Sequence, residues 1–313
     1  MKFFVGITDY EWFKLHASKT DVEEVNFWRP SPNASFKALQ PGEPFLFKLH
    51  SPDNFIVGGG FFAKFLKLPI SLAWDAFGEA NGAHSIEEVK ERISKYRRAE
   101  VGFTEDPNIG CILLAEPFFF PENEWIPSAP YFPPHTQVGK TYSMDEAEGF
   151  YLWSEISERF ANLKIAANDP GPATIAVIES ARYGNPVQVN PRLGQGSFRI
   201  LVTDAYSRRC AMTHDKTLPV LEAAHIRPYS LGGGHEISNG LCLRSDLHRL
   251  FDKGYLTVDP DDKSIIVSRR LKEEFDNGKE YYPLHGKRIM MPLDSAALPS
   301  RAHLRFHTEN IFR

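Results

Sequence analysis

The chain has 313 residues, 42% hydrophobic and 24% charged, a globular composition that excludes wholesale disorder. A net charge of −4 excludes a surface that is basic all over, although residues 186–313 carry 19 Lys/Arg against 15 Asp/Glu. Three cysteines cannot build a disulfide framework and no apolar run spans a membrane, so we expect a cytoplasmic protein with no membrane partner.

Residues 1–140 are predicted to form a β-rich domain. Dense aromatic residues and Pro/Gly turns separate short apolar runs. Helical spacing of apolar residues and a capping box indicate helices at Leu72–Phe77 and Ser85–Tyr96. The apolar runs predict strands at Phe3–Ile7, Phe45–Leu49, Phe55–Val57 and Ile109–Phe120, the third of which ends in Gly58–Gly60.

Two further parts complete the predicted organisation. Residues 141–195 are expected to form a helix at 143–165 and a linker rich in turns. Residues 196–313 form a second domain. Its excess of positive charge makes it the better candidate for contact with phosphates.

The segment from Arg208 to Asp259 carries the chemistry. Its sequence predicts a strand ending at His225, a loop forced by Pro228 and Gly232–Gly234, a second strand, and a helix that contains His248. Asn239 lies between the loop and the second strand. A neutral histidine is a suitable general base near pH 7, and phosphodiester hydrolysis needs one to activate water.

This pattern resembles the HNH nuclease family, whose fold is called ββα-metal. The resemblance rests on AAHIRPYSLGG, NGL and LHRLFDKG, in that order and at the family's spacing. It implies an HNH endonuclease domain in which His225 is the general base and His248 binds a divalent metal. It also implies that Asn239 holds the loop and the base in place.

The metal ligands depart from the family pattern. Many members have Asp or His directly before the base histidine, and this chain has Ala224 there. Glu222, on the same face of the predicted strand, and Asp246 are the candidate substitutes. Oxygen and imidazole ligands suit Mg²⁺ or Mn²⁺ and tolerate Ni²⁺ or Co²⁺.

Two further predictions concern the roles of residues around the motif. Arg227, Arg244 and Arg249 are candidate DNA-binding residues, although each could be an ordinary surface charge. A structural zinc site is an alternative that would use Cys210, His214, His235 and Cys242. The paired cysteines of the family's zinc-knuckle branch are missing, which favours Cys210 and Cys242 as small buried hydrophobic residues.

The N-terminal part resembles the PUA-like superfamily, which contains the EVE, ASCH and SRA domains. The resemblance rests on FKALQPGEPFLFKLHSPDNFIVGGGFF, a strand, a Pro-Gly turn, and a strand ending in glycines. It implies a PUA-like β-barrel with flanking helices that reads a modified base flipped from the duplex. Asn26, Trp28, Phe61 and Phe62 are the predicted pocket, with the hydrophobic core as the alternative place for each of them.

The predicted fold class is therefore α+β, with a PUA-like reader, a helical linker and an HNH domain. This combination resembles modification-dependent restriction endonucleases, which cut modified foreign DNA. The expected partner is double-stranded DNA that carries modified bases, and a homodimer is possible because one HNH site cuts one strand. The alternatives are a sequence-specific HNH restriction enzyme acting on unmodified DNA and a catalytically inactive nucleic-acid reader.

Overall fold

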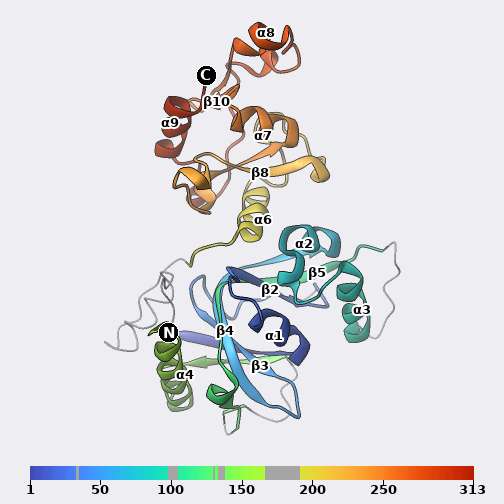
Figure 1. Ribbon diagram of the computed structural model, residues 1–313, viewed down its shortest axis with the longest axis vertical. Helices are drawn as coiled ribbons and strands as arrows, with labels where there is room; N and C mark the ends of the chain where they lie inside the picture. Colours follow the sequence, from blue (N-terminus) through green and yellow to red (C-terminus); the bar gives the residue numbers. More distant parts are fainter. Residues whose placement is uncertain (33–34, 98–104, 130, 133–137, 166–190) are drawn as a thin grey trace. The chain divides into compact units, whose positions relative to one another are not determined.

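The computed structural model divides into two compact units, Met1–Gly194 and Gln195–Arg313 (Figure 1). It describes residues 1–32, 35–97, 105–129, 131–132, 138–165 and 191–313. The predicted α+β class is confirmed, because both units mix sheets with helices. Among the described helices, none has the length and apolarity that crossing a bilayer requires.

One bent sheet forms the centre of the first unit. Its strand order is β2-β5-β4-β3-β1-β7, with β6 on a further edge of β4. Among the described strands, β1 and β3 pair in parallel and the other pairs are antiparallel. The strands are β1 (Lys2–Thr8), β2 (Glu24–Arg29), β3 (Pro44–Leu49), β4 (Phe55–Pro69), β5 (Asn108–Phe119), β6 (Ile126–Pro127) and β7 (Gly139–Ser143).

Strand β4 bends the sheet. Register shifts interrupt its pairing with β5 between Gly59 and Phe61 and between Phe62 and Lys64. A Cβ atom on Gly58 would lie 2.2 Å from the carbonyl oxygen of Phe118, so only glycine allows this approach of β4 to β5. The predicted strand end at Gly58–Gly60 is therefore wrong. Here the glycines permit close pairing, and β4 continues to Pro69.

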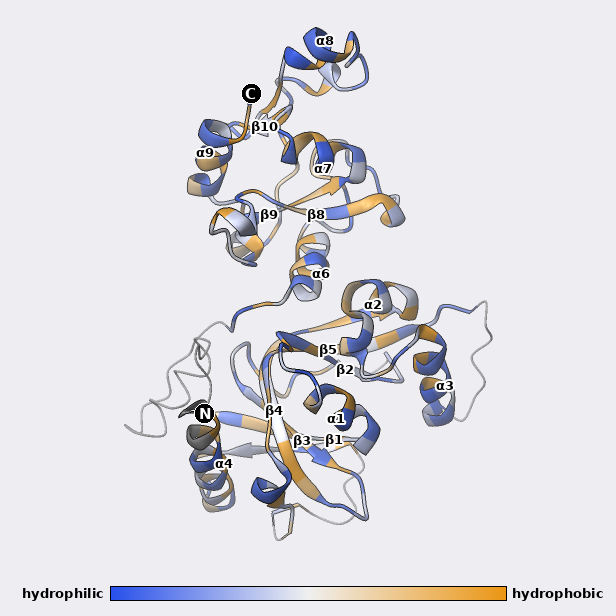
Figure 2. Ribbon diagram, viewed as in Figure 1, coloured by the Kyte–Doolittle hydropathy of each residue, from blue (hydrophilic) through white to orange (hydrophobic). Residues whose placement is uncertain are grey.

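Among the described residues of this unit, the helices are α1 (Tyr10–Ala17), α2 (Ile70–Phe77), α3 (Ile86–Arg97) and α4 (Ala147–Ile165). Helix α4 belongs to the first unit, since its buried residues Leu152, Trp153, Ile156 and Phe160 pack in one cluster with Phe3. Hydrophilic and hydrophobic residues alternate along it (Figure 2). The segment predicted as a linker therefore begins after this helix, and residues 166–190 lie outside the described residues.

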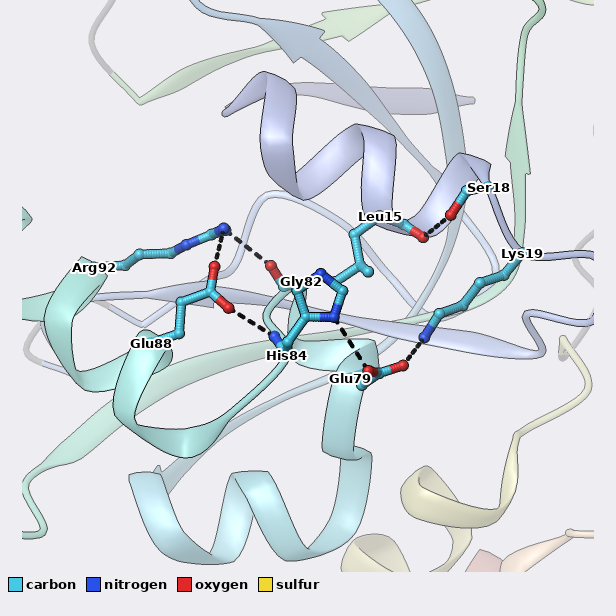
Figure 3. A network of polar contacts seen from close by, with 8 residues as sticks. All are labelled: Leu15, Ser18, Lys19, Glu79, Gly82, His84, Glu88 and Arg92. Carbon is cyan, nitrogen blue, oxygen red and sulfur yellow. Dashed lines mark hydrogen bonds and ion pairs between the residues drawn. The ribbon is translucent and has the colours of Figure 1, made fainter.

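A polar network ties α1 to the start of α3 (Figure 3). Lys19, just after α1, pairs with Glu79 at 2.6 Å, and Glu79 also contacts the ring of His84 at 3.3 Å. The Glu88 carboxylate accepts from the backbone N–H of His84 and from Arg92. These contacts fix α1 and α3 relative to each other, and each helix carries aromatic residues that line the cavity described below.

The second unit is built on the β8–β9 hairpin and helix α7, in the predicted order of strand, loop, strand and helix. Its core includes the fully buried side chains of Tyr206, Phe198 and Phe251. The elements are α6 (Gln195–Ala205), β8 (Leu221–His225), β9 (Gly240–Arg244), α7 (Ser245–Asp252), β10 (Leu256–Val258), β11 (Ile265–Val267), α8 (Arg270–Phe275) and α9 (Arg301–Asn310).

Short 3₁₀ turns connect these elements. Two of them, η4 and η5, lie in the loop between β8 and β9. The 3₁₀ turns of the two units are η1 (Gly78–Asn81), η2 (Glu122–Glu124), η3 (Leu218–Val220), η4 (Tyr229–Leu231), η5 (Ile237–Asn239), η6 (Tyr282–Leu284) and η7 (Ser295–Ala297).

His307 joins α9 to the centre of the second unit. Its ring is buried and stacks on Phe251, with the ring centroids 3.7 Å apart. Its Nε2 lies 3.1 Å from the carbonyl oxygen of Phe251 and its Nδ1 lies 2.9 Å from Thr257 Oγ1. Nε2 therefore donates, and the neutral ring accepts from the hydroxyl. Burial lowers the pKa of His307 to about 4.

We predict that His307 makes the second unit sensitive to acid. Because the unfolded ring binds a proton near pH 6.5 and the folded ring only near pH 4, stability falls as the pH drops through this window. The contribution at pH 5 is a loss of about 2 kcal/mol relative to pH 7. Urea unfolding at both pH values, on wild type and His307→Gln, measures it. An equal loss in both proteins would contradict the assignment.

Candidate functional site

The β8–β9 hairpin brings the predicted catalytic residues together. His225 is the last residue of β8 and pairs with Gly240, the first residue of β9. Asn239 directly precedes β9, and α7, which carries His248, directly follows it. Ala224 is fully buried in the core of the unit, so the side chain at this position faces no ligand.

Asn239 fastens the loop that follows His225. Its buried amide accepts from the backbone N–H of Arg227 at 2.9 Å and donates to the carbonyl oxygens of Arg227 at 3.0 Å and Gly234 at 2.9 Å. A Cβ atom on Gly233 would lie 1.9 Å from the Arg227 carbonyl oxygen, so the loop needs glycine there. The amide thus closes the loop beside the end of β8.

Replacement of Asn239 by alanine should destabilise the second unit by about 2–4 kcal/mol, because three partly buried backbone groups lose their partner. Thermal unfolding of wild type and Asn239→Ala measures the change. Asn239→Asp, which keeps the acceptor but loses the two donated bonds, should fall between them. An unchanged melting temperature in the alanine variant would show that the loop is held by other contacts.

His248 lies between two carboxylates. Its Nδ1 is 2.7 Å from Glu222 Oε2 on β8, and its Nε2 is 3.2 Å from Asp252 Oδ2, one turn further along α7. Glu222 is the predicted substitute ligand. Asp252 was not among the predicted site residues. Its spacing of four residues from His248, which places both on one helix face, could have indicated it.

Asp246 points elsewhere. Its carboxylate forms two contacts with the guanidinium of Arg244, at 2.7 and 3.0 Å. The prediction that Asp246 substitutes for the missing metal ligand therefore differs from the geometry, in which Asp252 contacts His248 instead. The reason is local: Arg244 ends β9 next to the first turn of α7 and pairs with the carboxylate there.

The donor types around His248 fit a divalent cation. Carboxylate oxygens with one imidazole nitrogen are ligands that Mn²⁺ accepts. Partial desolvation raises the pKa of Asp252, although the side chain is about half exposed, and a bound cation would favour its charged form. In the described part of the chain, no three His, Cys, Asp or Glu side chains already surround a metal position. A metal on His248 would replace one of the two carboxylate contacts of its ring.

His225 is held in a partly apolar setting. Its ring stacks on Phe198 with centroids 4.0 Å apart, and its Nε2 lies 3.0 Å from Nδ1 of His235. Burial lowers the pKa of His225 to about 4, assisted by His235 and His248 and opposed by Glu236. The ring is therefore neutral at pH 7, the form that a general base requires.

The three candidate arginines have different surroundings. Arg227 donates from Nε to the carbonyl oxygen of Leu231 at 2.8 Å, and its guanidinium lies 4.5 Å from the ring centroid of Phe306. Arg244 is paired with Asp246. Arg249 is exposed, and no described residue forms an ion pair with it, so it is the arginine most available to a phosphate.

The zinc alternative has no support in the described residues. Cys210 and Cys242 are fully buried free thiols within the core cluster of the second unit. His235 contacts His225 instead of a cysteine. The interpretation of both cysteines as small buried residues agrees with this packing.

The first unit contains a cavity of about 400 Å³. Asp9, Arg29 and His50 are polar residues on its wall. Asp9 Oδ1 accepts from the hydroxyl of Tyr96 at 2.6 Å and lies 3.7 Å from His50 Nε2. Aromatic rings form much of the wall: Phe4, Trp12, Phe27, Trp28, Phe36, Phe45 and Tyr96. No pattern in the sequence indicated Asp9 or Tyr96, which lie far apart along the chain.

Trp28 is the one predicted pocket residue that lines this cavity. Its indole N–H donates to the carbonyl oxygen of Asn81 at 2.9 Å. Asn26 is buried against Asn81. Phe61 and Phe62 are core residues, because opposite faces of β4 are both covered: Phe61 packs near Phe118 and Phe160, and Phe62 near Phe36. The pocket predictions for Asn26, Phe61 and Phe62 are corrected accordingly.

Comparison with known proteins identifies the second unit. Residues 210–259 match the family model described as HNH endonuclease. The segment contains His225, Asn239 and His248, so the chain carries an HNH endonuclease domain and is a nuclease by that domain. No curated protein matches the chain.

Two solved structures are similar over long stretches. An ASCH protein from Zymomonas mobilis is 12% identical, over 48% of this chain and 94% of that one, with a TM-score of 0.34. A modification-dependent restriction endonuclease, TagI, is 13% identical, over 97% of this chain and 81% of that one, with a TM-score of 0.28.

Proposed function

We propose that the protein is a metal-dependent endonuclease that hydrolyses double-stranded DNA carrying modified bases. The observation that carries the nuclease part is the hairpin of the HNH domain, with neutral His225 at the end of β8 and His248 beside Glu222 and Asp252 on the adjoining helix. The second unit cuts, the first unit selects the DNA, and a cytoplasmic location fits both tasks.

The residues of the chain have separate roles in this proposal. His225 takes a proton from the attacking water, and the phosphorus–oxygen bond to the leaving 3′ oxygen breaks. Asp252 and the Nε2 side of His248 would hold Mg²⁺ or Mn²⁺, with Glu222 on the opposite ring nitrogen, Nδ1, orienting the ring. When bound, the ion supplies positive charge to the leaving oxygen. Arg249 contacts a phosphate near the cut. Because one such site cuts one strand, a double-strand break would favour a homodimer or two molecules acting together.

The aromatic cavity supports the selection of a flipped base. A volume of about 400 Å³ lies within the range of small-molecule pockets. Trp28 and its aromatic neighbours offer faces on which a base stacks, which offsets the few kcal/mol that unstacking from the duplex costs. Asp9 offers a carboxylate acceptor for an exocyclic amino group, the group that adenine and cytosine carry.

Cleavage of matched plasmids tests the proposal. The protein is incubated with Mn²⁺ and with plasmids of one sequence that are unmodified or carry one kind of modified cytosine each. We expect cutting of one modified plasmid only. Discrete cutting of the unmodified plasmid would favour a sequence-specific enzyme. Tight binding to one plasmid without cutting of any would favour an inactive reader.

Trp28→Ala should reduce the preference for modified over unmodified DNA by about 5- to 150-fold, because loss of one stacking face costs about 1–3 kcal/mol. Competition between the two plasmids in one reaction measures it. Tyr151→Ala, which removes an exposed aromatic ring of α4 outside the cavity, is the matched control. An unchanged preference in Trp28→Ala would show that this cavity does not select the modified DNA.

A further inference from the structure

The geometry around His225 includes a second histidine that the HNH motif residues do not cover. His235 lies in the loop between η4 and η5, and its Nδ1 is 3.0 Å from Nε2 of His225. The ring of His235 stacks on Tyr229, with centroids 4.8 Å apart and planes 14° apart. The ring of His225 stacks in turn on Phe198. Stacking therefore holds both rings of the pair in place.

The contact restricts the tautomer of His225. A neutral imidazole carries one N–H, so in a hydrogen bond between two neutral rings one nitrogen donates and the other accepts. If Nε2 of His225 accepted, its proton would sit on Nδ1 and no lone pair would remain to take a proton from water. If Nε2 donates to His235, the lone pair is on Nδ1. No described residue forms a hydrogen bond with Nδ1 of His225.

We propose that His235 is a positioning residue that accepts a hydrogen bond from Nε2–H of His225 and so holds Nδ1 as the proton-accepting atom. A water proton moves to Nδ1 of His225 while the water oxygen bonds to phosphorus. The bond from phosphorus to the 3′ oxygen breaks, and solvent protonates the leaving oxygen. The resulting imidazolium keeps its Nε2–H on His235, whose lone pair stabilises the charge.

The loop is built to deliver this acceptor. Asn239 and Gly233 close the segment between Arg227 and Gly234, directly before His235. The chain therefore reaches His235 from a fixed point beside the end of β8. A histidine in this place has an acceptor on Nδ1 when its own proton is on Nε2, which is the tautomer that the proposal assigns to it.

Two substitutions separate the acceptor from the ring. His235→Phe keeps a ring against Tyr229 and removes the acceptor. His235→Asn removes the ring and keeps an acceptor oxygen near the place of Nδ1. Single-turnover cleavage at saturating DNA should fall about 100-fold in His235→Phe, the lower part of the range for general-base catalysis, and less than about 10-fold in His235→Asn. DNA binding by both variants serves as the control for folding.

The tautomer is measured directly by two-bond ¹H–¹⁵N correlation on histidine-labelled wild type at pH 7. Assignment uses the spectrum of His225→Ala. We expect His225 with its proton on Nε2 in wild type and loss of that single tautomer in His235→Phe. A proton on Nδ1 in wild type, or cleavage by His235→Phe at the wild-type rate, would overturn the proposal.

This inference rests on the proposed function only for its kinetic arm. If wild type cuts none of the plasmids, the nuclease proposal fails, while the NMR spectrum still decides which nitrogen of His225 is protonated. If wild type cuts and His235→Phe cuts at the wild-type rate, the positioning role fails and the nuclease proposal stands.

Discussion

Alanine in place of His225 is expected to lower the rate of cleavage by about 10²–10⁴-fold, the contribution of a well-placed general base. The ring is neutral at pH 7 because burial lowers its pKa to about 4, so wild type has the basic form available throughout the neutral range. Single-turnover cleavage of modified DNA with saturating Mn²⁺ measures the loss.

Binding separates this effect from misfolding. The described contacts of His225 are with Phe198 and His235, and none of them involves the three candidate DNA-binding arginines. We therefore expect His225→Ala to bind modified DNA with wild-type affinity. His214→Asn is the matched control, because His214 is exposed and Asn tolerates its positive φ of 62°. Wild-type cleavage by His225→Ala would remove it as the base.

The second large effect concerns the metal. His248→Ala should abolish Mn²⁺ binding measured by calorimetry, and cleavage with it, because the imidazole is the nitrogen ligand in the proposed set. Asp252→Asn should weaken Mn²⁺ binding by about 10–100-fold. Asp246→Asn should leave it unchanged, because the Asp246 carboxylate is paired with Arg244.

This comparison distinguishes the two carboxylates of α7. If Asp246→Asn weakened Mn²⁺ binding and Asp252→Asn left it unchanged, Asp246 would be the ligand. That result would contradict the contacts seen at His248. Circular dichroism of both variants controls for the helix. Neither change removes a residue of the hydrophobic core.

The sequence predicted the hairpin and helix of the HNH domain because their order is local. His225, Asn239 and His248 fall within 24 positions of the chain, and turn residues fix the path between them. Asp252 and His235 were harder to assign, since many helices carry acids at this spacing and a loop residue can face either way. Only the folded loop shows which ring His235 meets.

The first unit was less predictable. Its strands follow from apolar runs, but helix α1 and strand β2 were not predicted, since Tyr10–Ala17 is short and carries mixed charge. Asp9, Trp28 and Tyr96 meet only because β2, α1 and α3 come together in space. A dense set of phenylalanines cannot show which rings face a cavity and which face one another, as Phe61 and Phe62 demonstrate.

The contacts of His307 bear on how this nuclease can be dissected. The segment that matches the HNH family ends at residue 259, while α9 starts at Arg301 and covers Phe251 of α7 through the His307 ring. A peptide cut to the family signature would uncover that phenylalanine and lose the partner of Thr257. The recognisable signature and the cooperative folding unit thus have different lengths, and a transplanted catalytic module must include the C-terminal helix.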